Sequence, residues 1–393
     1  MTPERFNCRW AGLSLSNIAG VFFPDILLPR DPADPIQHEL VAVSTTGTQE
    51  RAASWLNEHK IPNASSIKIY QSWEEMLEKG DFDIVYVSTP HPLHYIHVRK
   101  ALQCKRNVLV EKPATMNRRQ YEELIRLARQ QGVILMEAMW TRYLPATRYL
   151  HEQLLPRIGE VRRVYAEFSF PIVSPDLPHS SRFLDKKAGA GSLLDQGVYA
   201  LTWADLALHG LDNGANTTTE VVHAQTMSVP GVPGDVDDIT TVVLASREKG
   251  SDRQNAVGII TTSMTLPGSN KPPFYRRLQA KRSSPAVRIE GTKASVAVPF
   301  PPIRPQELHV QWYGEDGVNE DGTEKDEVIR KPIEKGWGIW YQADVIAKQV
   351  QETRKTQGPG VVIGAEESLR VLGFMDKARE LAGIRYDSSL EEV

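Results

Sequence analysis

Cysteine, net charge and long apolar runs are all scarce in this sequence of 393 residues. Its 2 cysteines, Cys8 and Cys104, are too few for a disulfide framework or a thiolate metal site, so we interpret both as free thiols. The 46 basic and 49 acidic side chains leave a net charge of −3, which provides no sequence-wide positive field for nucleic acid. No stretch has the character of a signal peptide or a membrane span, so we expect a cytoplasmic protein with no membrane-embedded part.

Glycine is missing from one place where it is expected. The segment WAGLSLSNIAG, from Trp10 to Gly20, stands where a first strand should turn into a first helix. It has the layout of a dinucleotide-binding turn, but serines occupy the positions at which glycines normally allow the tight turn and the approach of phosphate. Whether such a turn still holds a nucleotide decides between a redox enzyme and a protein derived from one.

The order of apolar runs predicts two domains. Up to residue 142, short β-branched runs such as FDIVYVST and NVLVE alternate with helical patterns, which is typical of a doubly wound parallel sheet, the Rossmann fold. One of these helices should begin at an Asn117 cap and end at Gly132. Residues 143–393 change to alternating strands joined by Gly, Pro and Asn turns, which predicts an α+β domain with a large, mostly antiparallel, open-faced sheet. The acidic segment Tyr313–Val328 is expected to be an exposed loop, and residues 365–383 form an amphipathic helix that packs back on the domain.

Two local patterns contain side chains suited to chemistry. Lys112 follows a buried strand directly, and the carboxyl ends of parallel strands face the ligand cleft. Asp195 and Tyr199 are four residues apart, which places a carboxylate and a phenol on one face of a helix. Each has an ordinary alternative: a surface lysine, a Ser192–Asp195 capping box, and a tyrosine packed in the core.

Several motifs in the same order resemble the Gfo/Idh/MocA oxidoreductase family, in particular its dihydrodiol and NADP-dependent D-xylose dehydrogenases. The motifs are DIVYVSTPHPLHY, NVLVEKPAT, LMEAMWTRYLP, GSLLDQGVYALTW, VRIEGTKASVAV and EESLRVLGFMDKAR. They span nearly the whole chain. The resemblance implies a hydride transfer between NADP and the carbinol carbon of a hydroxyl-bearing position in an aldopyranose or a trans-dihydrodiol, and it implies a homodimer.

The same resemblance implies roles for individual residues. The catalytic group would be Lys112, Asp195 and Tyr199, with Tyr199 as proton acceptor, Lys112 tuning it and Asp195 orienting Lys112 or a hydroxyl of the substrate. Residues implied to bind substrate are Lys112, Trp140, Arg142, Arg182, Asp195 and Tyr199. Residues implied to bind the cofactor are Ser14, Ser16, Asn17, Ile18, Ser44, Thr45, Thr46, Arg51, Thr89, Pro90, His91, Glu111 and Lys112.

Three histidines in TPHPLHYIH follow one another at three-residue steps. The family resemblance implies that His91 lines the nicotinamide side of the cleft, whereas His94 and His97 are expected on the helix surface. No companion cluster of ligands is apparent, so we expect no metal site.

The residues after the second strand bear on the choice of cofactor. An NAD site usually has an acidic residue there, but this chain has Ser44, Thr45 and Thr46 followed by Arg51. Hydroxyls and a guanidinium suit a 2′-phosphate and favour NADP over NAD. A helix cap followed by a solvated arginine is the ordinary alternative.

The serine substitutions weaken the expected grip on phosphate. Ser14 and Ser16 replace both glycines of the family's G-x-G-x-x-A turn, and a serine at positive φ costs about 1 kcal/mol. The hydroxyls and the helix amides can still bind an anion. Two other functions on the same scaffold therefore stay open: a non-redox enzyme that uses acid–base or cyclisation chemistry, and a regulatory binding protein.

Overall fold

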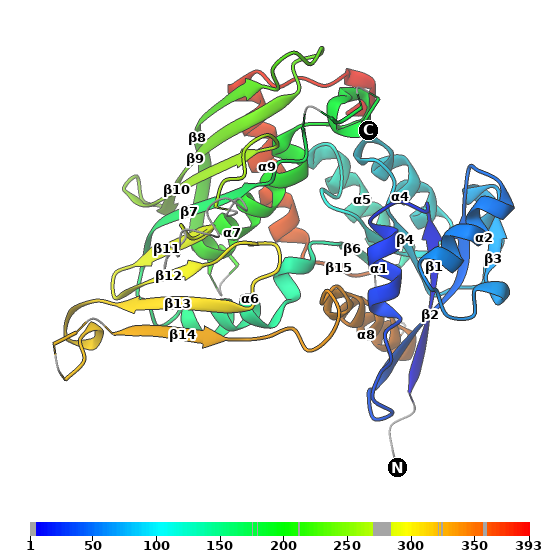
Figure 1. Ribbon diagram of the computed structural model, residues 1–393, viewed down its shortest axis with the longest axis horizontal. Coiled ribbons are helices and arrows are strands. Elements are labelled where there is room, and N and C mark those ends of the chain that lie inside the picture. The colour runs from blue at the N-terminus through cyan, green and yellow to red at the C-terminus, as the bar shows by residue number, and fades with distance from the viewer. Residues whose placement is uncertain are drawn as a thin grey trace. The chain divides into compact units, whose positions relative to one another are not determined.

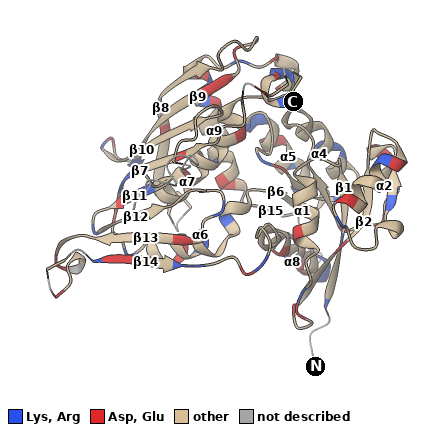
Figure 2. Ribbon diagram, in the orientation of Figure 1, with Lys and Arg blue, Asp and Glu red and all other residues tan. Residues whose placement is uncertain are grey.

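The computed structural model describes residues 5–393 except 175, 179, 211–212, 270–283, 321, 324 and 357–359. It divides into two compact units (Figure 1). Unit 1 comprises residues 1–140, 334–365 and 392–393, and unit 2 comprises residues 141–333 and 366–391. Lysine and arginine are interspersed with acidic residues along the elements of both units (Figure 2), in keeping with the small net charge.

Unit 1 is built on a parallel sheet of seven strands in the order β15-β6-β5-β4-β1-β2-β3. Neighbouring strands run parallel throughout, and β4 has all four of its residues buried because helices cover both faces. The strands are β1 (Phe6–Leu13), β2 (Ile36–Ser44), β3 (Lys68–Tyr70), β4 (Ile84–Val87), β5 (Asn107–Val110), β6 (Leu135–Glu137) and β15 (Val362–Ile363). The helices of this unit are α1 (Ala19–Ile26), α2 (Gln49–Glu58), α3 (Trp73–Lys79), α4 (His94–Gln103), α5 (Arg118–Gln131) and α8 (Trp340–Thr356).

Local signals place these helices. Asn117 caps α5 by accepting a hydrogen bond from the amide of Gln120 at 2.9 Å, and Gly132 ends the helix with φ of 69°. Both ends are as predicted. The strand order reverses between β1 and β4, so their carboxyl ends form the point at which open parallel sheets bind ligands.

The chain returns to unit 1 after residue 333, whereas the sequence division assigned all of 143–393 to the second domain. Asp344 of α8 accepts both guanidinium hydrogen bonds of Arg30, at 2.7 and 2.8 Å, and lies 2.9 Å from Nε2 of His38. Trp10 of β1 donates to Nδ1 of the same imidazole at 3.0 Å. Burial lowers the pKa of His38, and these contacts join α8 to the first two strands.

Unit 2 contains a sheet of eight strands in the order β14-β13-β12-β11-β7-β10-β9-β8. Every neighbouring pair is antiparallel except β7 and β10, which run parallel. Helix α7 (Val198–His209) packs against β7, β10 and β11. The strands are β7 (Val161–Ser169), β8 (Thr217–Ser228), β9 (Asp237–Glu248), β10 (Gln254–Ser263), β11 (Val287–Gly291), β12 (Ala294–Val298), β13 (Glu307–Trp312) and β14 (Asp326–Arg330), and the other helices are α6 (Pro145–Tyr149) and α9 (Ala365–Ala382).

The predicted fold class is confirmed: a Rossmann-type sheet and a mostly antiparallel sheet. The acidic segment Tyr313–Val328 is only partly a loop, because its last three residues start β14 and pair with β13. The exposure of successive residues alternates along β14, which suits an edge strand with one face in water. Residues 321 and 324 of that segment lie outside the described part of the chain.

Candidate active site

The turn after β1 has the strain that its sequence predicts. Ser14 adopts a φ of 97°, which is a conformation that favours glycine, and it is partly exposed. A serine in this region costs about 1 kcal/mol relative to one in ordinary backbone. Ser14 therefore occupies the position of a turn glycine at the expense of stability.

Ser16 has a different part in the turn. Its backbone is not in the left-handed region, and its Oγ accepts a hydrogen bond from the amide of Ala19 at 3.2 Å. The same hydroxyl donates to Oγ of Ser88, after β4, at 2.9 Å. Ser16 thus ties the start of α1 to the neighbouring strand.

These two serines give a matched pair of substitutions with opposite expected effects. Ser14→Gly should raise the free energy of unfolding by about 1 kcal/mol, because glycine adopts positive φ without strain. Ser16→Gly should lower it by about 1 kcal/mol, because the cap to Ala19 and the bond to Ser88 are lost. Urea unfolding of the two variants checks both signs; stabilisation by both, or by neither, would contradict this account.

A cavity of about 390 Å³ lies within unit 1 at the carboxyl ends of β1, β2 and β4. Seven of the residues expected to bind cofactor line it: Ser14, Ser44, Thr45, Thr46, Arg51, Thr89 and Pro90. Seven others that the sequence did not single out for binding also line it: Leu13, Leu15, Gly47, Trp55, Trp73, Leu93 and His97. Hydroxyls and one guanidinium therefore share the wall with two indole rings.

His97 is buried in this wall and not on the helix surface as expected. Its Nδ1 lies 3.0 Å from Oγ1 of Thr89, and the ring of Trp73 meets it edge-on at 4.6 Å between centroids. Burial lowers the pKa of His97 to about 4, so the imidazole is neutral at pH 7. A signal was present in the sequence, because His97 precedes Val98 and is four residues from Ala101 on the apolar stripe of α4.

Lys112 lies in the loop after β5, where hydrogen bonds to two glutamates hold the backbone amides on either side of Pro113. The amide of Lys112 donates to Oε2 of Glu111 at 3.2 Å, and the amide of Ala114 donates to Oε1 of Glu137 at 3.0 Å. The hydroxyl of Tyr86 donates to the other oxygen of Glu111 at 2.5 Å. Desolvation raises the pKa of the Glu111 carboxyl, against the opposing effects of Tyr86 and Lys112. Glu111 was expected to bind the cofactor, but both of its carboxylate oxygens accept hydrogen bonds that hold the loop after β5.

His94 was also expected on the helix surface, and this prediction is wrong. The side chain is fully buried, with Nδ1 2.9 Å from the carbonyl oxygen of Pro113 and Nε2 2.8 Å from that of Thr89. Burial lowers its pKa to about 4. Because a neutral imidazole has one N–H, it donates to one carbonyl at a time. His94 connects the Lys112 loop with the residues that follow β4.

Asp195 and Tyr199 both lie in unit 2 at the junction of two helical segments. A single π-helical segment, Leu193–Gly197, contains Asp195 and continues into α7, which contains Tyr199. Such π segments are frequent at functional sites. Both side chains are buried, and the guanidinium of Arg182 lies 3.5 Å from Oδ2 of Asp195. The ring of Phe168 meets that of Tyr199 edge-on at 5.5 Å.

The capping box considered for Ser192 and Asp195 does not form. Ser192 has helical backbone angles and makes no side-chain cap, and its hydroxyl contacts Asp237, Thr240 and Thr262.

The other expected site residues have separate positions. Trp140 is buried at the end of unit 1, and Arg142, in unit 2, donates to Oγ of Ser368 at 3.1 Å. Asn17 and Ile18 are exposed at the start of α1, whereas His91 is buried with its ring 5.8 Å from that of His94. Lys112 belongs to unit 1 and Asp195 and Tyr199 to unit 2, so the structure describes the two parts of the expected catalytic group separately.

Within the described ranges, no group of three or more His, Cys, Asp or Glu residues is placed to hold a metal ion. None of the helices described there has both the length and the apolar character needed to cross a membrane.

Both units of the chain are similar to proteins of known family. Residues 27–139 match the family model described as an oxidoreductase family with an NAD-binding Rossmann fold, and residues 156–297 match the GFO/IDH/MocA C-terminal domain. The chain is 28% identical to the D-xylose 1-dehydrogenase (NADP(+)) of Hypocrea jecorina, over 97% of this chain and 93% of the relative. It is 29% identical to the trans-1,2-dihydrobenzene-1,2-diol dehydrogenase of Danio rerio, over 96% and 98%.

Solved structures agree on the fold. KijD10, a 3-ketoreductase from Actinomadura kijaniata in complex with NADP and TDP-benzene, superposes with a TM-score of 0.71 at 23% identity. The match covers 96% of this chain and 98% of that one.

Proposed function

Because the chain belongs to the GFO/IDH/MocA family of oxidoreductases, we propose that it is an NADP-dependent dehydrogenase that acts on a CH–OH group of a sugar or a trans-dihydrodiol. Relatives of both kinds align with it over nearly their whole length. The observation that carries the proposal is the cavity of unit 1, with Arg51 and the hydroxyls after β2 in its wall. The nearby loop bearing Lys112 supports it.

The residues of the cavity fit NADP. Ser44, Thr45 and Thr46 offer hydroxyl donors, and Arg51 offers a guanidinium for the 2′-phosphate, with no acidic residue among those that line the cavity. The turn at Ser14 and the start of α1 would hold the pyrophosphate through backbone amides. When bound, NADP supplies the two-electron oxidant.

Residues of the chain would then remove the proton of the substrate hydroxyl. Oxidation of a carbinol requires a base within hydrogen-bond reach of its oxygen. In the proposed arrangement, the Lys112 ammonium favours the phenolate form of Tyr199 and donates a hydrogen bond to the substrate oxygen, and the phenolate oxygen accepts the hydroxyl proton. Asp195, held by Arg182 at 3.5 Å, orients a neighbouring hydroxyl.

Fluorescence titration with NADPH, followed by NADP reduction with a panel of aldopyranoses and trans-diols, tests the proposal. Tight NADPH binding together with turnover of one substrate class is the expected result. A protein that binds no NADPH at millimolar concentration would not be an NADP enzyme.

A regulatory binding function is the second candidate, and the serine that replaces a turn glycine at position 14, with φ of 97°, supports it. Binding of NADPH without turnover of any substrate would select this function. A cytoplasmic location and a homodimer stay predictions; exposed Val222 and Met227 on β8 support association through that sheet.

Arg51 provides a specific test of cofactor choice. Arg51→Gln should weaken NADPH binding about 10- to 100-fold, which is the usual effect of losing a charge-assisted contact to phosphate. NADH binding should change little, because NADH has no 2′-phosphate. Arg119→Gln, a second exposed arginine of unit 1, provides the control in the same titrations. Equal losses for both cofactors would indicate that Arg51 does not contact the 2′-phosphate.

A further inference from the structure

The turn that leads into the Asp195 helix contains two glycines with positive φ. Gly189 has φ of 77° and Gly191 has φ of 137°. Glycine adopts positive φ without strain, but it also has more backbone conformations available to it in the unfolded chain and in other arrangements of the turn. The orientation of the helix that follows, with Asp195 and Tyr199, therefore depends on contacts from outside the turn.

Asp237, the first residue of β9, provides one such contact. Its Oδ2 accepts hydrogen bonds from the amide of Leu193 at 2.8 Å and from Oγ of Ser192 at 3.2 Å. Oγ1 of Thr262 in turn donates to the Ser192 hydroxyl at 2.9 Å. The Asp237 side chain is fully buried, so these bonds are shielded from water.

The other carboxyl oxygen of Asp237, Oδ1, lies close to the backbone of Gly191. A Cβ at Gly191 would lie 2.0 Å from Oδ1, so only glycine fits there. Among the residues that the structure describes, none makes a hydrogen bond to this Oδ1. Burial raises the pKa of the Asp237 carboxyl. Burying a carboxyl with an unpartnered oxygen lowers the free energy of unfolding. Such a group in a folded protein calls for an explanation, and here the explanation is that the carboxyl positions the neighbouring backbone.

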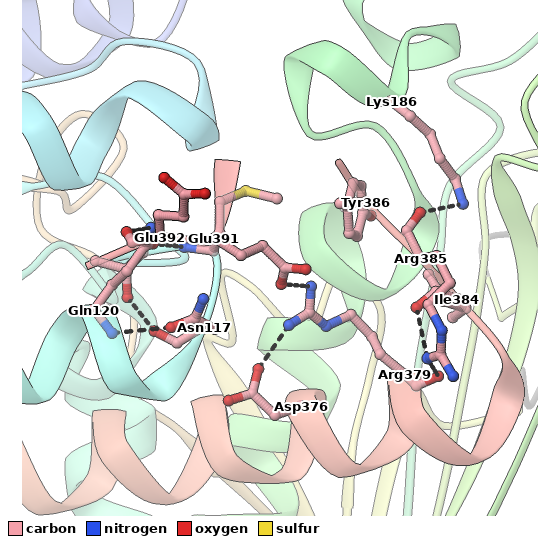
Figure 3. Close-up of polar contacts among 12 residues, drawn as sticks. Asn117, Gln120, Lys186, Asp376, Arg379, Ile384, Arg385, Tyr386, Glu391 and Glu392 are labelled. Carbon is pink, nitrogen blue, oxygen red and sulfur yellow. Dashed lines mark hydrogen bonds and ion pairs between the residues drawn. The ribbon is translucent and has the colours of Figure 1, made fainter. Parts of the chain in front are cut away.

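The C-terminal segment, residues 384–391, holds the turn from another element. The hydroxyl of Tyr386 donates to the carbonyl oxygen of Ala190 at 2.8 Å, and Nζ of Lys186 donates to the carbonyl oxygen of Arg385 at 2.9 Å. Arg379 of α9 pairs with Glu391 at 2.7 Å and so anchors the far end of the segment (Figure 3). All of these groups belong to unit 2.

We propose that Tyr386 and Asp237 are positioning residues that hold the turn at 189–192 and thereby set the Asp195 carboxylate and the Tyr199 phenol for reaction. This inference rests on the proposed function for the roles of Asp195 and Tyr199. Neither positioning residue contacts substrate or cofactor in this assignment. Tyr386 acts from the C-terminal segment and Asp237 from the sheet.

Tyr386→Phe tests the proposal with little disturbance, because the buried ring stays and only the hydroxyl bond to Ala190 is lost. We expect kcat to fall about fivefold, which is the usual effect of one hydrogen bond, while the dissociation constant of NADPH stays within a factor of about two. Hydrogen exchange of the amides at 193–195 should accelerate by a similar factor. Tyr313→Phe, an exposed tyrosine of the same unit, should change none of these quantities.

Asp237 supplies the second pair of variants. Asp237→Asn keeps an oxygen that accepts from Leu193, so we expect its kcat within about threefold of the wild-type value, whereas Asp237→Ala should lose about tenfold or more. If Asp237→Ala does not fold, Tyr386→Phe decides the matter. Unchanged exchange and unchanged kcat in Tyr386→Phe would overturn the proposal. Absence of turnover in the wild-type enzyme would instead overturn the proposed function, and the exchange measurement would still judge the positioning.

Discussion

Replacement of Tyr199 by phenylalanine is expected to lower kcat by about 10²- to 10⁴-fold, the range typical of a lost general acid or base. The phenolate of Tyr199 is the group that accepts the proton in the proposed reaction, and phenylalanine keeps the ring against Phe168. NADPH affinity should be unaffected, because the cavity that would hold the cofactor lies in unit 1. Steady-state rates of NADP reduction, together with NADPH titrations, measure both quantities.

Lys112 extends the same test to unit 1. Lys112→Met keeps the aliphatic stem, removes the ammonium, and should lower kcat by a similar factor. Lys105→Met and Tyr313→Phe are the matched controls, and both should retain wild-type turnover. Substantial activity in Lys112→Met and Tyr199→Phe, with correctly folded proteins, would show that proton transfer uses other groups.

The free energy of unfolding should fall as the pH is lowered, in part because of His94. The ordinary pKa of the imidazole is 6.5 and burial lowers it to about 4 in the folded chain. Between these values the unfolded chain binds the proton and the folded chain does not, so the contribution of His94 is complete above pH 6.5 and is lost as the pH falls toward 4. A difference of this size corresponds to about 3 kcal/mol when the titration is complete.

Urea unfolding from pH 7.5 to pH 5 measures this contribution, and about 2 kcal/mol of it should be lost over that range. His97, whose pKa is also lowered to about 4, adds a loss of the same sign. His94→Gln should therefore flatten the pH dependence by the His94 share alone. A slope equally steep in His94→Gln would place the titration elsewhere.

Much of the architecture could be predicted from local patterns. The buried runs of β4 and β5, the Asn117 cap and the Gly132 stop each depend on residues close together in sequence, and the structure confirms them. Ser14 was also predictable, because the dinucleotide turn requires positive φ at that position whatever residue occupies it. The residues after β2 that line the cavity were predicted from their place after the second strand, where an NAD site usually has an acidic residue.

The remaining features depend on contacts between distant residues. Trp73 lines the cavity and packs edge-on against His97, and nothing in the WEEMLEK sequence reveals that partner. Asp237 looks like a strand-end carboxylate, and its hold on Leu193 appears only when β9 and the π segment lie together. The hydroxyl of Ser16 was expected to donate a hydrogen bond to phosphate. In the structure it donates to Ser88 and accepts from the amide of Ala19.

The discontinuity of unit 1 has a consequence for biosynthesis. Strand β15 forms the edge of the sheet beside β6, and Asp344 of α8 contacts His38 and Arg30, yet both elements are translated only after the eight-stranded sheet of unit 2. Domains fold as units during synthesis, generally from the N-terminus onward. Here the first sheet emerges from the ribosome with its β6 edge unpaired and the side chains of His38 and Arg30 awaiting Asp344. The later sheet is the first that can be completed, and closure of the nucleotide-binding unit is a late event.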